Sequence, residues 1–179
     1  MLLSSTAFGF DFKADWNAKW IGLTEDSAVN TWLAYRTGVE LDSVPKEVIA
    51  NIACASKYWL WINGEMAVFE GQLKRGPNSK DTYYDPVDIA PYLKRGENTI
   101  AILVWHFGKH GFSHNNSGKA GLIFDTQLFR SDSSWKVIKH PAFGMTGQKH
   151  PNFRLPESNV LFDARKDMGD WTAPAFDDT

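Results

Sequence analysis

The segment that most constrains the fold of this chain is an aromatic run that ends in a turn signal, Tyr58-Trp59-Leu60-Trp61-Ile62-Asn63-Gly64. An Asn-Gly pair between two strand-like runs predicts a β-hairpin, because both residues tolerate the positive φ that a type I′ turn requires. Side chains alternate across a strand, so Trp59 and Trp61 should share one face while their neighbours occupy the other. We expect the neighbours to fill a core. The two indoles then need a cover: a second layer, a partner domain or a flat ligand such as a sugar ring.

Strand-like runs separated by turn residues dominate the remainder of the chain, which predicts two packed antiparallel sheets. One helical turn is expected at Ile89–Leu93, where Asp88 is placed to cap it. A length of 179 residues suits a single domain. We predict an N-terminal extension over 1–19, a β-sandwich over 20–140 and an extended tail over 141–179 that leads towards a following domain absent from this chain. The predicted strands are Trp32–Leu41, Glu47–Ala55, Lys57–Ile62, Glu65–Glu70, Thr82–Val87, Thr99–Phe107, Gly121–Phe129 and Ser134–Ile138.

Composition and missing motifs exclude several classes of function. A net charge of −2 gives no electrostatic case for nucleic acid or an anionic membrane, and no long uncharged apolar run could span a bilayer. Cys54 is the only cysteine, so an internal disulfide is excluded, and its apolar flanks predict a buried thiol. No Gly-x-Ser-x-Gly elbow or phosphate-binding glycine loop is present. We therefore predict no cofactor and no catalytic nucleophile.

Five short motifs follow one another along the chain: Trp20-Ile21-Gly22, Ala34-Tyr35-Arg36, Tyr58-x-Leu60-x-Ile62-Asn63-Gly64, Tyr84-Asp85-x-Val87-Asp88-Ile89 and Leu93-Lys94-x-Gly96-x-Asn98-x-Ile100-Ala101. In this order they resemble the N-terminal β-sandwich of bacterial α-L-rhamnosidases. The resemblance implies an all-β, antiparallel jelly-roll β-sandwich of the galactose-binding-domain kind. Its central block, residues 58–101, is shared in looser form with sugar-binding domains of β-galactosidases and β-glucuronidases. The later run Phe162-Asp163-Ala164-Arg165, with Trp171 and Phe176-Asp177-Asp178, resembles the junction in the rhamnosidases.

The resemblance also implies where catalysis would take place. Rhamnosidases of this family hydrolyse terminal α-L-rhamnose with inversion, and both catalytic carboxyl groups lie in a large (α/α)6 domain that this chain lacks. No position here matches the family's catalytic motif, so we expect a non-catalytic module whose partner is that catalytic domain. The parent would be a periplasmic or extracellular glycoside hydrolase. Two further hypotheses stay open: an independent carbohydrate-binding module for rhamnose-containing oligosaccharides, and an enzyme in its own right.

A sugar site would need flat rings for the apolar face of a pyranose and polar side chains for its hydroxyl groups. Aromatic residues at strand positions are more often packed in a core or against another domain, so packing remains the alternative for each tryptophan. The loop after Trp105 is rich in amide and imidazole groups. The candidate residues for contact with carbohydrate or with another domain are Trp59, Trp61, Trp105, His110, His114, Asn115 and Asn116.

Two groups of side chains raise the question of a metal. Asp81, Asp85 and Asp88 are admissible calcium ligands, although Asp88 already has a predicted role as a helix cap. Histidines recur at 106, 110 and 114, but Gly108 and Gly111 argue against the helix that would align them. We therefore predict no metal, with calcium at the aspartates as the minority alternative.

Overall fold

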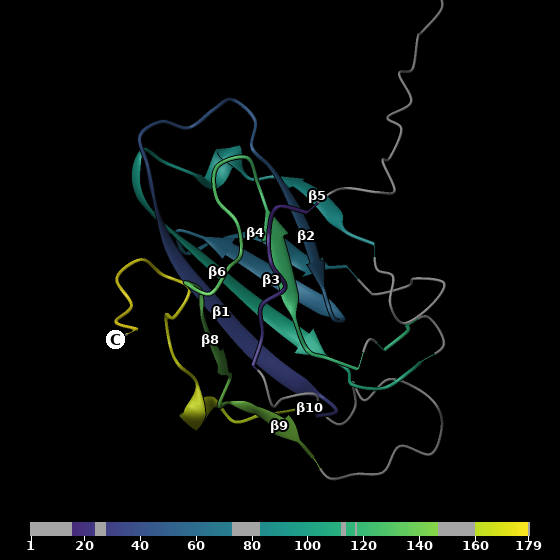
Figure 1. Cartoon of the computed structure of the whole chain (residues 1–179). Coiled ribbons are helices and arrows are strands. Elements are labelled where there is room, and N and C mark those ends of the chain that lie inside the picture. Colours follow the sequence, from purple (N-terminus) through teal and green to yellow (C-terminus); the bar gives the residue numbers. More distant parts are fainter. Residues whose placement is uncertain are drawn as a thin grey trace, which may run out of the picture.

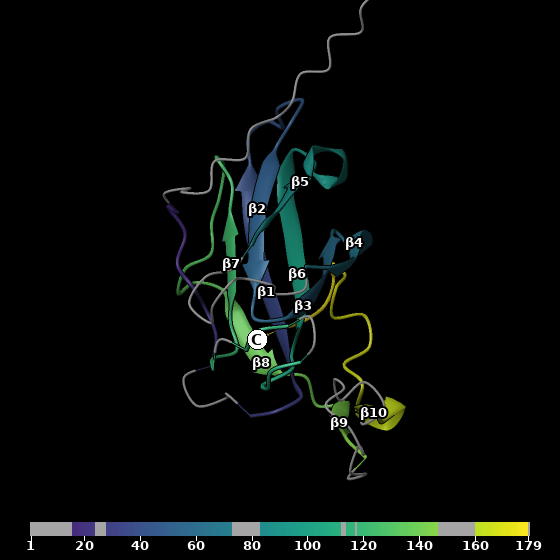
Figure 2. The ribbon, with the colours of Figure 1, turned by 90° about the vertical axis from the view of Figure 1, so that its right-hand side faces the viewer.

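The computed structural model describes residues 16–23, 28–72, 83–111, 114–116, 118–146 and 160–178. Within these residues two antiparallel sheets face each other, as Figures 1 and 2 show, and this confirms the predicted jelly-roll sandwich. One sheet has the strand order β4-β3-β6-β1-β8, the other β5-β2-β7, and β10 pairs with β9 separately. The strands are β1 (Thr31–Leu41), β2 (Ile49–Cys54), β3 (Lys57–Ile62), β4 (Glu65–Gly71), β5 (Asp85–Asp88), β6 (Gly96–His106), β7 (Leu122–Asp125), β8 (Lys136–Lys139), β9 (Phe143–Met145) and β10 (Val160–Phe162), with short 3-10 helices η1 (Ala90–Tyr92) and η3 (Ala164–Lys166).

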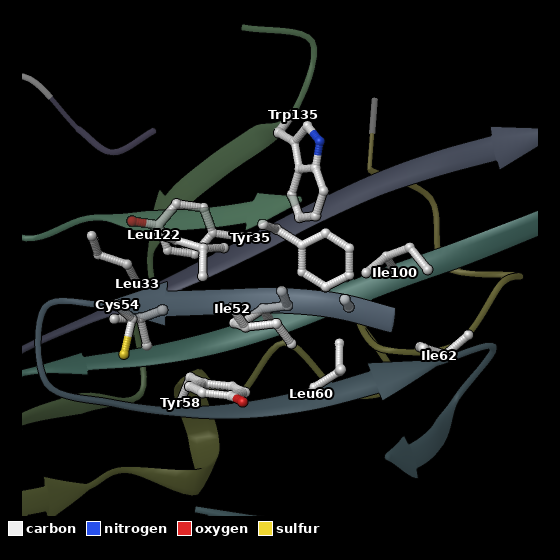
Figure 3. Packing of buried hydrophobic residues seen from close by; sticks show 14 of the residues in the cluster. Leu33, Tyr35, Ile52, Cys54, Tyr58, Leu60, Ile62, Ile100, Leu122 and Trp135 are labelled. Atoms are coloured by element: carbon white, nitrogen blue, oxygen red, sulfur yellow. The ribbon is translucent and has the colours of Figure 1, made fainter. Parts of the chain in front are cut away.

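The core lies between the two sheets, and alternate residues of the strands supply it (Figure 3). Leu60 of β3, Ile102 of β6 and Ile52 of β2 are completely buried in this cluster. Full burial of such a side chain contributes about 1.5–3 kcal/mol, so this layer is the main source of stability. The predicted alternation of β3 is confirmed, because its three core-facing residues are buried and Trp59 and Trp61 on the other face are half-buried.

The Asn-Gly hairpin is confirmed. Asn63 has φ of 54° and Gly64 has φ of 84°, so both central residues of the turn are left-handed. The Asn63 amide also ties the turn to its neighbours: Nδ2 donates to the Tyr92 carbonyl and to Asn98 Oδ1, both at 2.9 Å, and Oδ1 accepts from the Thr99 N–H at 3.0 Å. The side chain therefore anchors the turn to β6 as well as shaping it.

Most predicted strands have slightly different bounds in the structure, strands β9 and β10 lie in the predicted tail, and two elements differ more clearly. The strand expected over Gly121–Phe129 ends at Asp125, because Thr126 begins a turn in which its hydroxyl group accepts from the Leu128 N–H at 3.0 Å. The helical turn at Ile89–Leu93 is the shorter 3-10 helix η1. Asp88 does bind its first turn, through a 3.0 Å hydrogen bond from the Ala90 N–H to Oδ1. Of the strand expected at Thr82–Val87, β5 is described, while residue 82 lies outside the described residues.

The tail after residue 140 returns to the sandwich. β9 and β10 pair with each other, and the segment that follows, residues 163–178, lies along the five-stranded sheet (yellow in Figure 2). We call residues 163–178 the C-terminal strap. The predicted limits of the tail and of the sandwich stay a prediction. Most of the predicted extension over 1–19, the loop at 73–82 and the prolines at 151 and 156 lie outside the described residues. Among the helices of the described segments, none has the length and apolar character needed to cross a membrane.

Candidate functional site

The face of the five-stranded sheet that points away from the core, which we call the outer face, carries the candidate tryptophans. Trp32 of β1 stands directly opposite Trp105 of β6, and Trp59 of β3 stands opposite Leu103. The Trp32 and Trp105 rings are stacked, with centroids 4.7 Å apart. Cross-strand pairing of large aromatics stabilises a sheet, so the outer face holds a second, smaller hydrophobic cluster.

An aromatic band crosses this outer face. It consists of Phe69, Trp59, Trp32, Phe143 and Phe162, whose successive ring centroids are 6.5, 5.5, 4.1 and 5.0 Å apart. Trp32 in its middle is buried, whereas Phe69 on β4 is 73% exposed and Phe162 on β10 is 49% exposed. The band therefore presents aromatic surface to the outside at both of its ends.

Trp61 is covered by the chain itself. The Trp171 ring from the C-terminal strap meets it edge-on, with centroids 5.9 Å apart, and Trp171 is itself buried. The sequence left open what covers the two indoles. For Trp61 the cover is another segment of the same chain. Trp59 lies beside the exposed Phe69 and is only half-buried.

Trp105 is an internal packing residue. It is 5% exposed, and its indole N–H donates to Asn30 Oδ1 at 2.7 Å. Phe107 packs edge-on against it at 4.5 Å. A ring that is enclosed in this way offers no free face for a sugar. For Trp105 the structure therefore favours internal packing, the alternative stated for each tryptophan above.

The four polar candidates of the following loop occupy two different environments. His114 is buried: Nε2 lies 3.1 Å from Ser56 Oγ, and Nδ1 lies 3.1 Å from the Lys109 carbonyl oxygen. His110 is exposed, and its Nδ1 accepts from the Asn116 N–H at 3.2 Å. Asn115 is half-buried. The structure thus brings His110 and Asn116 together at the surface, while His114 fastens the loop to the sandwich.

A second buried histidine, His106, has an unusual environment. It is completely buried, and neither ring nitrogen has a hydrogen-bond partner among the described residues. Burial, assisted by the nearby His114, lowers the pKa of His106 from 6.5 to about 4. The imidazole is therefore neutral at physiological pH.

The aspartates considered for calcium are engaged by the protein. Asp85 Oδ2 accepts from the Tyr58 hydroxyl at 3.0 Å and from the Gln72 N–H at 2.8 Å. Asp88 Oδ1 accepts from the Val48 and Ala90 N–H groups. Asp81 lies outside the described residues, and among those described no group of three His, Cys, Asp or Glu side chains is arranged to hold a metal. That the protein binds no metal stays a prediction.

Sequence reasoning missed a pocket on the outer face. It has a volume of about 300 Å³ and lies between the C-terminal strap and strands β1 and β8. At its edge Arg36 and Lys136 bind Asp178 at 2.7 and 2.8 Å. No local pattern could have indicated it, because Arg36 and Asp178 are 142 positions apart. The residues lining it are Ala34, Arg36, Lys136, Val137, Ile138, Met168, Trp171, Phe176, Asp177 and Asp178.

No profile of a known protein family matches the chain. Two α-L-rhamnosidases of Formosa agariphila are similar in sequence. One is 25% identical over 213 residues and the other 24% identical over 183 residues. The alignments cover 93% and 92% of this chain but 21% and 20% of those enzymes. The chain thus spans about a fifth of the length of these relatives.

Solved structures give the same match. The GH78 family rhamnosidase of Bacillus sp. GL1 superposes with a TM-score of 0.76 and 32% identity, over 93% of this chain and 18% of that one. The α-L-rhamnosidase from Dictyoglumus thermophilum superposes with a TM-score of 0.67 over 92% of this chain and 20% of that one. At 22% identity this second match supports the fold alone.

Proposed function

Because the chain corresponds to one β-sandwich domain of the larger α-L-rhamnosidases, we propose that it is a non-catalytic accessory domain that supports the catalytic part of such an enzyme. The similarity is confined to about a fifth of each relative, so rhamnoside hydrolysis is proposed only for the parent protein. The proposal includes a periplasmic or extracellular location, where polymeric glycans are met.

Two carboxylates on the C-terminal strap, Asp163 and Asp178, are unsuited to the general-acid role of a glycosidase. A general acid for glycoside hydrolysis needs a raised pKa. Hydrogen bonds from Lys136, together with the charge of Arg36, hold the pKa of Asp178 below its ordinary value. Arg165 does the same to Asp163. Both groups are therefore ionised at neutral pH and unsuited to donate a proton.

The observation that carries the proposal is the aromatic band with its exposed ends. Interface cores are rich in aromatic side chains, and large exposed aromatic patches mark surfaces that another body covers. Phe69 and Phe162 lie at the two ends of the band, and both are exposed. We assign the cover of this surface to the remainder of the parent enzyme.

The test mixes this chain with the separately produced remainder of its parent enzyme and measures association by calorimetry. Phe69→Ser should weaken association, because it removes exposed aromatic area from the band. Leu128→Ser is the matched control, since Leu128 is also exposed but lies on the turn after β7. Equal binding by the two variants, or turnover of a chromogenic rhamnoside by this chain alone, would contradict the proposal.

A carbohydrate-binding role is the second candidate, and the half-buried Trp59 beside Phe69 favours it. An indole at a surface can stack against the C–H face of a sugar ring. Titration of the chain with rhamnose-containing oligosaccharides should then give heat that Trp59→Ala abolishes. An absence of heat at millimolar ligand would leave only the supporting role.

A further inference from the structure

The C-terminal strap crosses the outer face from one side of the sheet to the other. Near its middle Trp171 contacts Trp61 on β3, and at its end Asp178 binds Lys136 on β8. Since β6 and β1 lie between β3 and β8, the strap passes over four strands. Figure 2 shows it, in yellow, running beside the sheet from the β9–β10 pair towards β4.

The strap does not pack closely against the sheet over its whole length. The pocket of about 300 Å³ separates it from β1 and β8. Apolar contact holds the strap at Trp171, which is buried in the second hydrophobic cluster, with Met168 and Phe176 of the strap packed against the same cluster. Beside the pocket, polar contacts add to this attachment.

Arg36, in the middle of β1, provides four of these contacts, and Lys136, Ala142 and His140 provide others. Its Nε donates to the Trp171 carbonyl at 3.0 Å, Nη2 to the Ala173 and Phe176 carbonyls at 2.8 and 3.5 Å, and Nη1 to Asp178 Oδ2 at 2.7 Å. The side chain is 12% exposed, so these bonds are shielded from water. The planar guanidinium suits this task because its donors are fixed in direction, whereas a lysine would supply one point charge.

We propose that Arg36 is a positioning residue that fastens the C-terminal strap as a cover over the pocket and over Trp61. All three guanidinium nitrogens are used, and all four acceptors belong to the strap. When the strap leaves, Trp61 loses its Trp171 cover and the pocket opens. The strap then determines whether the outer face presents one accessible indole or two.

Hydrogen exchange on the full chain, read by mass spectrometry, tests this proposal. Arg36→Met keeps the apolar stem and removes every donor. Loss of hydrogen bonds from a buried charged group should speed exchange in strap peptides by about ten- to a hundredfold. Peptides from β6 should exchange as in the wild type, and acrylamide should quench more of the tryptophan fluorescence.

Two further variants separate positioning from a general loss of structure. Arg36→Lys keeps the charge opposite Asp178 but not the fork, so its strap should exchange at an intermediate rate. Arg165→Met is the matched control, because Arg165 is 89% exposed and its ion pair, with Asp163, stays within the strap. If Arg36→Met accelerates β6 and the strap equally, or leaves the strap as slow as Arg165→Met does, the proposal is overturned. If Arg36→Met does not fold, a strap that is equally slow in Arg36→Lys and the wild type overturns it.

Discussion

Acidification should destabilise this protein through His106. The ring is completely buried and neither nitrogen has a hydrogen-bond partner among the described residues, so a proton on it would be a buried, uncompensated charge. Burial, with a contribution from His114, lowers its pKa in the folded state from 6.5 to about 4. The unfolded chain therefore takes up the proton at a higher pH than the folded protein does.

The direction and size of the effect follow from this difference. Above pH 6.5 the imidazole is neutral in both states and has no effect on the pH dependence. As the pH falls towards 4, the unfolded state is protonated first, so the free energy of unfolding decreases. At about 1.4 kcal/mol for each pKa unit, the gap between 6.5 and about 4 corresponds to a loss of at most about 3.5 kcal/mol.

Urea unfolding followed by tryptophan fluorescence at several pH values between about 7.5 and 4 measures this loss. His106→Leu should remove most of it. A smaller loss in the same direction should remain, because burial also lowers the pKa of His140. The His106 ring proton resonances provide a second readout in the wild type. Titration of His106 near 6.5, or an undiminished acid loss in His106→Leu, would refute the reasoning.

Three further predictions concern residues described above. Gly71→Ala should lower the free energy of unfolding by about 1–3 kcal/mol, since a Cβ there would lie 2.3 Å from the Tyr58 ring. Thermal unfolding measures this loss. Gly144→Ala is the control, because a Cβ at that position would have no atom within 4 Å, and equal melting temperatures of the two variants would contradict the clash. Asn63→Ala should lower the free energy of unfolding, measured by chemical denaturation, by about 2 kcal/mol or more. The variant loses three hydrogen bonds, and alanine adopts the left-handed φ of 54° less readily than asparagine does. Cys54, which is buried and has a raised pKa, should react with a thiol reagent only in denaturant, and rapid labelling of the native protein would disprove its burial.

Local signals were enough to predict the hairpin and its two faces. Asn63 and Gly64 adopt the turn that their backbone freedom favours, and the alternation of β3 needs only the pleat of a strand. The same alternation places Trp59 and Trp61 on one face. It cannot say what lies above that face, because the cover of Trp61 comes from Trp171, which is 110 positions further along the chain.

The candidate site shows the same division between local and distant causes. The sequence placed His110 and His114 in one loop but could not separate their roles, since the contacts of the buried His114 include the distant Ser56 and Ala55. Arg36 lay in a motif that resembles rhamnosidases, yet its partners are on the C-terminal strap. Contacts of this kind depend on the finished fold, so they leave no period or spacing in the sequence.

The long central pair of strands has a consequence for how the molecule is made. Every residue of β1, from Thr31 to Leu41, stands opposite a residue of β6, and β6 also holds β3. During synthesis β1 therefore has no neighbour on that side until residues 96–106 have left the ribosome, whereas the β3–β4 hairpin can form at once. Pairings between such distant segments are slow, so a chain halted before residue 96 would expose the long edge of β1 and invite aggregation.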